Sequence, residues 1–198
     1  MALPQKIEAS GHYIRLMSGH ENDLSAILTL WDETVAWLVS KGIEKQWGTM
    51  PFSKSPVMRD RFLSWLRRGE LFIARENVVY AGPIIATLAL VDTIPGYAAS
   101  AWGPSPDQGT YLEAFTTARM LRGSGLGTAL LGWAEAYTLA QGHTVLRLDC
   151  WAGNPALCEY YRAAGFQSHS TFRLGDWEGR TFEKRLAKAG SKHGDESQ

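Results

Sequence analysis

The sequence has no net charge, only two cysteines and no long apolar run, and each shortage excludes a class of protein. Its 198 residues include 20 Lys and Arg against 20 Asp and Glu. Nucleic-acid binding needs a basic surface, and attraction to an anionic membrane needs a polybasic segment, so we expect neither partner. The longest uncharged stretch, residues 77–91, is interrupted by Gly82 and Pro83, so we expect no membrane-spanning helix and no export.

Cysteines and histidines are too sparse for a disulfide framework or a metal centre. Cys150 and Cys158 do not form a CxxC pair, and the five histidines show no HExxH-like spacing. We therefore predict a reducing, cytoplasmic location and no metal.

The apolar content is sufficient for one large domain. Hydrophobic residues make up 45% of the chain, and a chain of this length buries about 70% of the surface that its unfolded form exposes. Both ends are small, polar and without periodicity. We predict one domain over residues 12–187, with flexible tails at residues 1–11 and 188–198.

Hydrophobic periodicity predicts an α/β chain. Apolar residues at helical spacing run from Glu21 to a stop at Gly42, and strands and helices alternate in the second half. That alternation implies at least one parallel strand pair with a crossover helix. The predicted strands are 13–17, 71–75, 84–91, 110–117, 145–150, 167–172 and 181–185, and the other predicted helices are 57–68, one ending near 141, and 155–164.

A glycine-rich turn, Arg122-Gly-Ser-Gly-Leu-Gly127, lies between an extended segment and an amphipathic helix. Glycines allow a sharp turn and let backbone amides converge on an external group. The helix N-terminus behind them attracts anions, and Arg122 adds a positive charge. The turn therefore predicts a diphosphate site.

Two other interpretations of this turn differ in how well they fit. A Walker loop is excluded, because no lysine follows the glycines before Lys184. The dinucleotide fingerprint lacks its last glycine, where Thr128 stands, but Asp149 lies near the spacing of its ribose partner. That fingerprint and a plain strand-to-helix turn both stay open on spacing alone.

A second motif follows the strand that ends near residue 150, where Asn154 precedes Tyr161-x-x-x-Gly165-Phe166. Here the chain resembles the GNAT superfamily of N-acetyltransferases. Residues 122–127 look like its pyrophosphate signature, and residues 154–166 look like its second signature. A helix and a strand separate the two, as in that superfamily.

The resemblance implies a mixed, mostly antiparallel central sheet, flanked by helices and splayed open between its fourth and fifth strands, with acetyl-CoA in the gap. The splayed strands would be residues 110–117 and 145–150. The cofactor would be held by strand backbone, the turn and the second motif, at Phe115, Thr116, Thr117, Arg122, Gly123, Ser124, Gly125, Leu126, Gly127, Thr128, Asn154 and Tyr161.

The chemistry needs a base, because an amine at neutral pH is mostly ammonium, and an acid for the leaving thiolate. Tyr161 matches the position of the family's usual acid, although a half-buried helix aromatic is the plainer interpretation. Glu113 shares a strand face with Tyr111, and Asp149 lies where the ribosomal-protein alanine acetyltransferases carry a carboxylate base. Glu113, Asp149 and a water chain remain alternatives for the base, and a structural pair of Arg147 with Asp149 also fits.

Three tryptophans, Trp31, Trp37 and Trp47, fall in the region that sets acceptor specificity in this superfamily. Aromatic faces suit a cationic amine, but tryptophans at helical spacing also fit a core. We name them as candidate acceptor-binding residues.

Together these observations predict an acetyl-CoA-dependent N-acetyltransferase. Its acceptor would be the primary amine of a small molecule, attacked directly in a ternary complex. The alternatives are acetylation of a protein N-terminus or lysine, and a regulatory module that binds acyl-CoA without turnover. A homodimer is implied by the resemblance alone.

Overall fold

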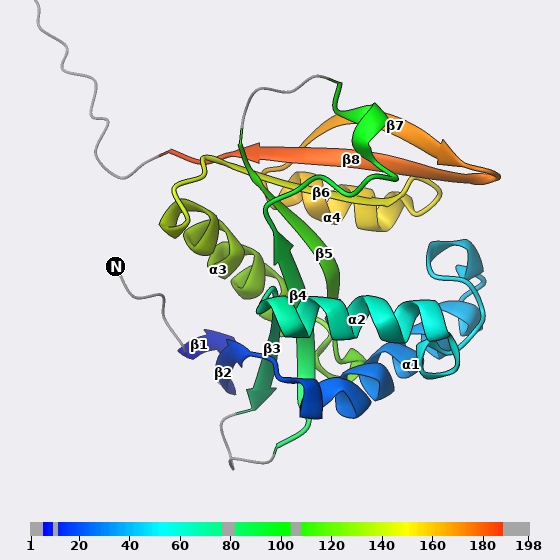
Figure 1. The fold of residues 1–198 in the computed structure, drawn as a ribbon, viewed down its shortest axis with the longest axis vertical. Coiled ribbons are helices and arrows are strands. Elements are labelled where there is room, and N and C mark those ends of the chain that lie inside the picture. Colours follow the sequence, from blue (N-terminus) through cyan, green and yellow to red (C-terminus); the bar gives the residue numbers. More distant parts are fainter. Residues whose placement is uncertain (1–5, 10–11, 77–81, 104–107, 188–198) are drawn as a thin grey trace, which may run out of the picture.

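An eight-stranded sheet forms the centre of the molecule, in the order β1-β2-β3-β4-β5-β6-β8-β7 (Figure 1). The computed structural model describes residues 6–9, 12–76, 82–103 and 108–187. The strands are β1 Lys6–Ala9, β2 His12–Ser18, β3 Leu71–Glu76, β4 Ile84–Val91, β5 Thr110–Thr117, β6 Val145–Trp151, β7 Gln167–Leu174 and β8 Trp177–Arg185. The helices are α1 Leu24–Ser40, α2 Pro56–Arg68, α3 Leu126–Ala140 and α4 Pro155–Ala163.

The predicted fold class is confirmed. Described neighbouring strands pair antiparallel except β5 and β6, which are parallel and joined through α3. Such a connection needs a crossover, and α3 provides it. None of the described helices combines the length and apolar character that crossing a bilayer requires.

The N-terminal hairpin differs from the sequence prediction, which assigned residues 1–11 to a tail. Lys6–Ala9 forms β1 and pairs with β2, with Ile7 opposite Ile14. Alternation of Lys6 and Glu8 with Ile7 and Ala9 explains the strand, since one face is apolar. The other residues of both predicted tails, 1–5, 10–11 and 188–198, lie outside the described residues.

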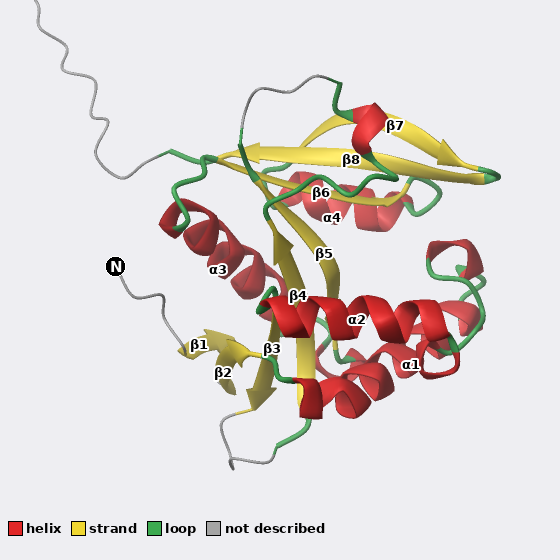
Figure 2. Ribbon diagram, viewed as in Figure 1, coloured by secondary structure: helices red, strands yellow, loops and turns green. Residues whose placement is uncertain are grey.

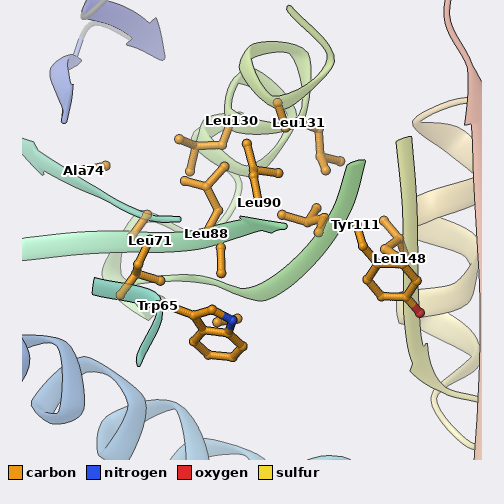
Figure 3. Close-up of a cluster of buried hydrophobic side chains, with 14 of the residues drawn as sticks. Trp65, Leu71, Ala74, Leu88, Leu90, Tyr111, Leu130, Leu131 and Leu148 are labelled. Carbon is orange, nitrogen blue, oxygen red and sulfur yellow. The ribbon is translucent and has the colours of Figure 1, made fainter. Parts of the chain in front are cut away.

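Helices pack on both faces of the sheet (Figure 2). Figure 3 shows Leu130 and Leu131 of α3 on one side of the strands and Trp65 of α2 on the other. Leu88 of β4 lies between these layers and is fully buried. Burying a leucine of this kind contributes about 1.5–3 kcal/mol, so the two helical layers hold β4 and β5 rigidly in place.

β5 and β6 separate part of the way along their length. Their ladder holds only the pairs Thr110↔Leu146, Tyr111↔Arg147 and Leu112↔Leu148. β5 continues to Thr117, but from Glu113 onward it has no partner in the described β6 ladder. The predicted splay is therefore present, between the fifth and sixth strands of this chain because β1 precedes the rest.

A β-bulge in β5 lies at the start of this separation. Ala89 pairs with Glu113 and Thr87 pairs with Thr116, so two residues of β5 oppose Leu88. Ala114 takes a φ of 47°, and its carbonyl accepts a hydrogen bond of 2.8 Å from the Thr87 hydroxyl. The Trp31 indole in turn donates to Thr87 at 3.0 Å. Buried side chains thus hold the bulge, which bends β5 away from β6.

Candidate active site

One large cavity of about 1070 Å³ opens where β5 and β6 separate. Single ligands usually occupy pockets of about 300–1,000 Å³, so this cavity has room for two reactants. Its walls come from α1, α2, β5, β6, α4 and the turn before α3. Every site residue named from the sequence lines it except Ser124, whose hydroxyl accepts the Leu126 amide at 3.3 Å.

The turn before α3 gives the cavity an anion-binding end. Gly125 precedes the helix with a φ of 78°, a conformation that glycine adopts without steric cost. The N-cap residue, Gly125, has no side chain to cap the helix, the Ser124 hydroxyl accepts only the Leu126 amide, and no acidic residue lies in the first turn. The first-turn amides and the helix dipole therefore favour a negatively charged group here.

Gly127 lies in close contact with α4. A Cβ atom at this position would lie 2.5 Å from the hydroxyl oxygen of Tyr160. Tyr160, which the sequence analysis did not name, lines the cavity beside the first turn of α3. Glycine at 127 thus lets α4 approach the anion-binding end.

Two arginines lie at this end, and the sequence analysis named only one of them. The Arg119 guanidinium lies 3.5 Å from the ring centroid of Trp37. Burial and the nearby Arg122 lower the pKa of Arg119. Among the described residues no carboxylate forms an ion pair with Arg119 or Arg122. Two uncompensated cations beside a helix N-terminus fit a diphosphate.

The open edge of β5 leads from the anion-binding end toward the centre of the cavity. Thr116 and Thr117 pair with β4 on one side, and their other side faces the cavity. The Thr116 hydroxyl lies 3.1 Å from that of Thr34 on α1. An unpaired strand edge can hydrogen-bond an extended ligand with amide groups.

Asn154 connects α4 to the segment after α1. Its side-chain oxygen accepts the Leu157 amide at 3.1 Å and so caps α4. Its amide nitrogen donates to Gln46 at 2.6 Å. A ligand that bonds to this nitrogen must therefore exchange with Gln46.

The two candidate carboxylates meet at the other end of the cavity. The Tyr97 hydroxyl lies 3.0 Å from Oε1 of Glu113 and 3.2 Å from Oδ1 of Asp149. Tyr111 donates to Asp149 at 2.6 Å, and Arg61 forms an ion pair with Glu113. Glu113 and Asp149, which the sequence analysis treated as alternatives, thus lie on one wall of the cavity.

The alternative pair of Arg147 with Asp149 does not describe this site. Arg147 points to β8 and donates to Glu183 at 3.0 Å. Asp149 instead accepts hydrogen bonds from the two tyrosines. Its charge is therefore stabilised by neutral donors, and it faces the cavity.

Burial sets the proton affinities in this cluster. It raises the pKa of Asp149 to about 6, against the lowering effect of the Tyr111 and Tyr97 hydrogen bonds. It also raises the pKa of Glu113, against the charge of Arg61. Burial and the Asp149 charge raise the pKa of both tyrosines, so they remain protonated donors. Asp149 is ionised at neutral pH and close to its own pKa, which suits a general base.

Tyr161 lies on the inner face of α4. It is 6% exposed and its ring packs 5.7 Å from that of Phe182. Burial raises the pKa of Tyr161 well above its usual value, so the phenol keeps its proton. Because it also lines the cavity, it can act as a proton donor.

The three tryptophans occupy three different environments. Trp31 is fully buried and supports the bulge through Thr87. Trp37 lies under Arg119 at the anion-binding end. Trp47 is 38% exposed, and its ring meets Trp31 edge-on at 5.2 Å. All three line the cavity, and Trp47 is the most exposed of them.

Sequence reasoning missed Tyr97 and Arg61. Tyr97 lies in the irregular connection between β4 and β5, where no periodicity marks its direction. Arg61 is on the polar side of α2, and its guanidinium lies 4.9 Å from the Trp65 ring and 5.4 Å from the Tyr97 ring. Their residue types alone could not identify them, because tyrosine and arginine occur on many protein surfaces without a functional role.

Comparisons with known proteins agree with this geometry. A model of the acetyltransferase (GNAT) family matches residues 39–166. The chain is 27% identical over 146 residues to YesJ of Bacillus subtilis, described as an uncharacterized N-acetyltransferase, and the match covers 73% of this chain and 77% of that one.

Solved structures share the fold. An acetyltransferase of the GNAT family from Listeria monocytogenes superposes with a TM-score of 0.71 at 20% identity, covering 91% of this chain and 99% of that one. The yncA protein of Salmonella typhimurium, solved with its cofactor acetyl-CoA, superposes with a TM-score of 0.58 at 15% identity, covering 90% of this chain and 96% of that one.

Proposed function

This chain belongs to the acetyltransferase (GNAT) family and is an N-acetyltransferase, and we propose that its acceptor is the primary amine of a small apolar molecule. The observation that carries the proposal is the position of Asp149. This carboxylate is held by two tyrosine hydroxyls in the same cavity as the anion-binding turn.

Acetyl-CoA, when bound, supplies an acetyl group activated as a thioester. The amides of the first turn of α3, with Arg122 and Arg119, would hold its diphosphate, since they form an uncompensated positive end. The open edge of β5 would hold its amide-bearing arm. Asn154 would join them by exchanging its bond to Gln46.

Asp149 is the better candidate for the base. Glu113 forms an ion pair with Arg61, which offsets its negative charge. Asp149 is held by neutral phenols and has a pKa of about 6, so at neutral pH it is ionised and accepts a proton from the acceptor amine.

Tyr161 provides the matching acid, and direct attack is favoured over an acyl-enzyme. The Tyr161 phenol keeps its proton and would donate it to the departing sulfur. Cys150 is the thiol on the cavity wall, but burial raises its pKa, so it stays protonated and is a poor nucleophile. The amine itself would therefore attack within a ternary complex.

The walls around the carboxylates suit an apolar body on the amine. Arg61 neutralises the charge of Glu113, so the net charge at this end is about one negative charge, that of Asp149. This charge matches an acceptor with a single positive charge. Aromatic faces nearby favour cations with flat or apolar substituents. The lining of the cavity that holds the carboxylates includes Trp47, Met50, Phe52, Phe62, Trp65 and Trp177.

A peptide acceptor is the second candidate, because the rim of the cavity is itself apolar. Met50 is 59% exposed and Leu174 is 48% exposed, and both line the cavity. Such a rim can contact side chains that follow a peptide N-terminus. An acceptor panel separates the two candidates.

The test combines cofactor binding with thiol release. Acetyl-CoA at 100 times its dissociation constant should stabilise the protein by about 2.7 kcal/mol. We then expect thiol release with 2-phenylethylamine and much slower release with spermidine, glycine or an alanine-initiated peptide. Fastest release with the peptide would replace the small-molecule proposal. The absence of any thermal shift with acetyl-CoA would overturn the function altogether.

A further inference from the structure

Tyr97 contacts both carboxylates through a single hydroxyl group. Its oxygen lies 3.0 Å from Oε1 of Glu113 and 3.2 Å from Oδ1 of Asp149. A phenol carries one proton, so at any moment it donates to only one of them. When it donates to one carboxylate, its oxygen lone pair faces the other.

The two ends of this bridge differ in charge compensation. Glu113 pairs with Arg61, whose side chain is 36% exposed. Asp149 faces the cavity and accepts a hydrogen bond from Tyr111, which among the described residues has no hydrogen bond to Glu113. Both carboxylates are half-buried and line the cavity, so what distinguishes them is that Glu113 lies beside a cation and Asp149 beside neutral phenols.

Every titratable group that influences the bridge can be placed. Arg61 faces it from α2, and Glu70 from the turn that follows α2. Tyr111 and Glu113 face it from β5, and Asp149 and Cys150 from β6. Tyr161 faces it from α4. Among these described groups, Arg61 is the one cation that adjoins the bridge directly.

Building on the proposed function, we propose that Tyr97 joins Asp149 and Glu113 into one proton-accepting unit. Asp149 takes the proton from the acceptor ammonium, so an N–H bond breaks and an O–H bond forms. Asp149 then gives this proton to the Tyr97 oxygen while Tyr97 gives its own to Glu113. Tyr97 ends as a neutral phenol, Asp149 as a carboxylate and Glu113 as a carboxylic acid beside Arg61.

Tyr97 is thus a positioning residue that acts through the carboxylates. Without its hydroxyl, Asp149 keeps the Tyr111 bond and still accepts a proton, but cannot pass it on. The Glu113 carboxylate contributes to turnover only while the bridge is intact. The effects of losing Tyr97 and of losing Glu113 therefore overlap.

A double-mutant cycle on kcat/KM tests this overlap. We expect Tyr97→Phe and Glu113→Gln each to lower kcat/KM about tenfold, and the double variant to be no more than about threefold worse than either single variant. Tyr111→Phe is the matched control, because its hydroxyl donates to Asp149 and, among the described residues, has no hydrogen bond to Glu113. When Tyr111→Phe is combined with Glu113→Gln, the fold losses in kcat/KM of the two single variants should multiply. Thermal unfolding checks that each variant folds, and Tyr97→Met replaces Tyr97→Phe if that variant does not.

A carboxyl ¹³C titration without substrate provides the second readout. Introduced alone, Glu113→Gln should lower the pH midpoint of the Asp149 titration. Introduced together with Tyr97→Phe, it should lower this midpoint by less than half as much. Equal shifts in both backgrounds, together with multiplied effects on kcat/KM, would overturn the proposal. A coupled titration in a wild type that acetylates no amine would contradict the proposed function and leave the bridge intact.

Discussion

The two ends of the cavity are built in different ways. The anion-binding end is made mainly by one continuous stretch, from Ala118 to Thr128, which carries both arginines and the start of α3. The carboxylate end is made by single side chains from α2, the β4–β5 connection, β5 and β6. A continuous backbone motif can be found in a sequence, whereas a cluster assembled by the fold cannot.

This comparison predicts that substitutions at one end change cofactor affinity and those at the other change turnover. Tyr161→Phe tests this separation, because Tyr161 lines the cavity from α4 and is a candidate both for the acid and for a cofactor contact. Loss of a general acid should lower kcat by about 10²–10⁴-fold. The acetyl-CoA dissociation constant, measured by titration calorimetry, should stay unchanged. Wild-type kcat in this variant would remove the acid role.

Gly127→Ala tests the anion-binding end alone. The new Cβ would lie 2.5 Å from the Tyr160 hydroxyl, so we expect a dissociation constant for acetyl-CoA at least about tenfold weaker and a largely retained kcat at saturation. Gly132→Ala is the matched control, since its Cβ meets nothing within 4 Å in the same helix. Adding Tyr160→Phe should restore affinity in part, because it removes the clashing oxygen. Equal affinities for the two alanine variants would contradict this account.

The pH dependence tests the carboxylate end. Because Asp149 has a pKa of about 6, kcat/KM should fall about tenfold per pH unit below 6 while acetyl-CoA affinity stays nearly constant. The stability effect has the opposite sign. The folded protein holds this proton more tightly than the unfolded chain, so the free energy of unfolding falls as pH rises from about 4 to about 6.

The size of that stability change follows from the shift. The rise in the pKa of Asp149 from 3.8 to about 6 corresponds to a change of about 3 kcal/mol in the free energy of unfolding. Asp149→Asn should lack this loss, as urea unfolding at pH 4 and pH 7 can measure. An unchanged pH dependence of stability in Asp149→Asn would contradict the burial of this carboxylate.

Thr87→Val tests the bulge that separates the two ends. It removes the hydroxyl that accepts from Trp31 and donates to Ala114. Leaving both buried partners unpaired should lower the free energy of unfolding by about 1–3 kcal/mol. Because β5 carries both ends, affinity and turnover should fall together and modestly. An effect on only one of them would show that the bulge positions a single end.

Much of the fold could be predicted because local rules decide it. β4 and β5 begin and end at the predicted residues, and α2 ends at Gly69 with a φ of 69°. β1 was missed because four residues are too short to show a period, and only pairing with β2 stabilises them.

The same distinction between local sequence and folded structure applies to the site residues. Glu113 and Asp149 could be named from their strand positions, but their common bridge could not, because Tyr97 is 52 residues from Asp149 in the chain. The tryptophan cluster shows the same limit. Trp31 and Trp37 act through Thr87 and Arg119, contacts that only the folded chain creates.

The most direct test of the account is the Asp149→Asn variant, measured for acetyl-CoA binding by calorimetry and for thiol release with 2-phenylethylamine in the same preparation. The account predicts an unchanged dissociation constant for acetyl-CoA and a turnover lower by about 10²–10⁴-fold. Turnover equal to the wild type, or loss of cofactor binding together with turnover, would contradict the separation of the two ends.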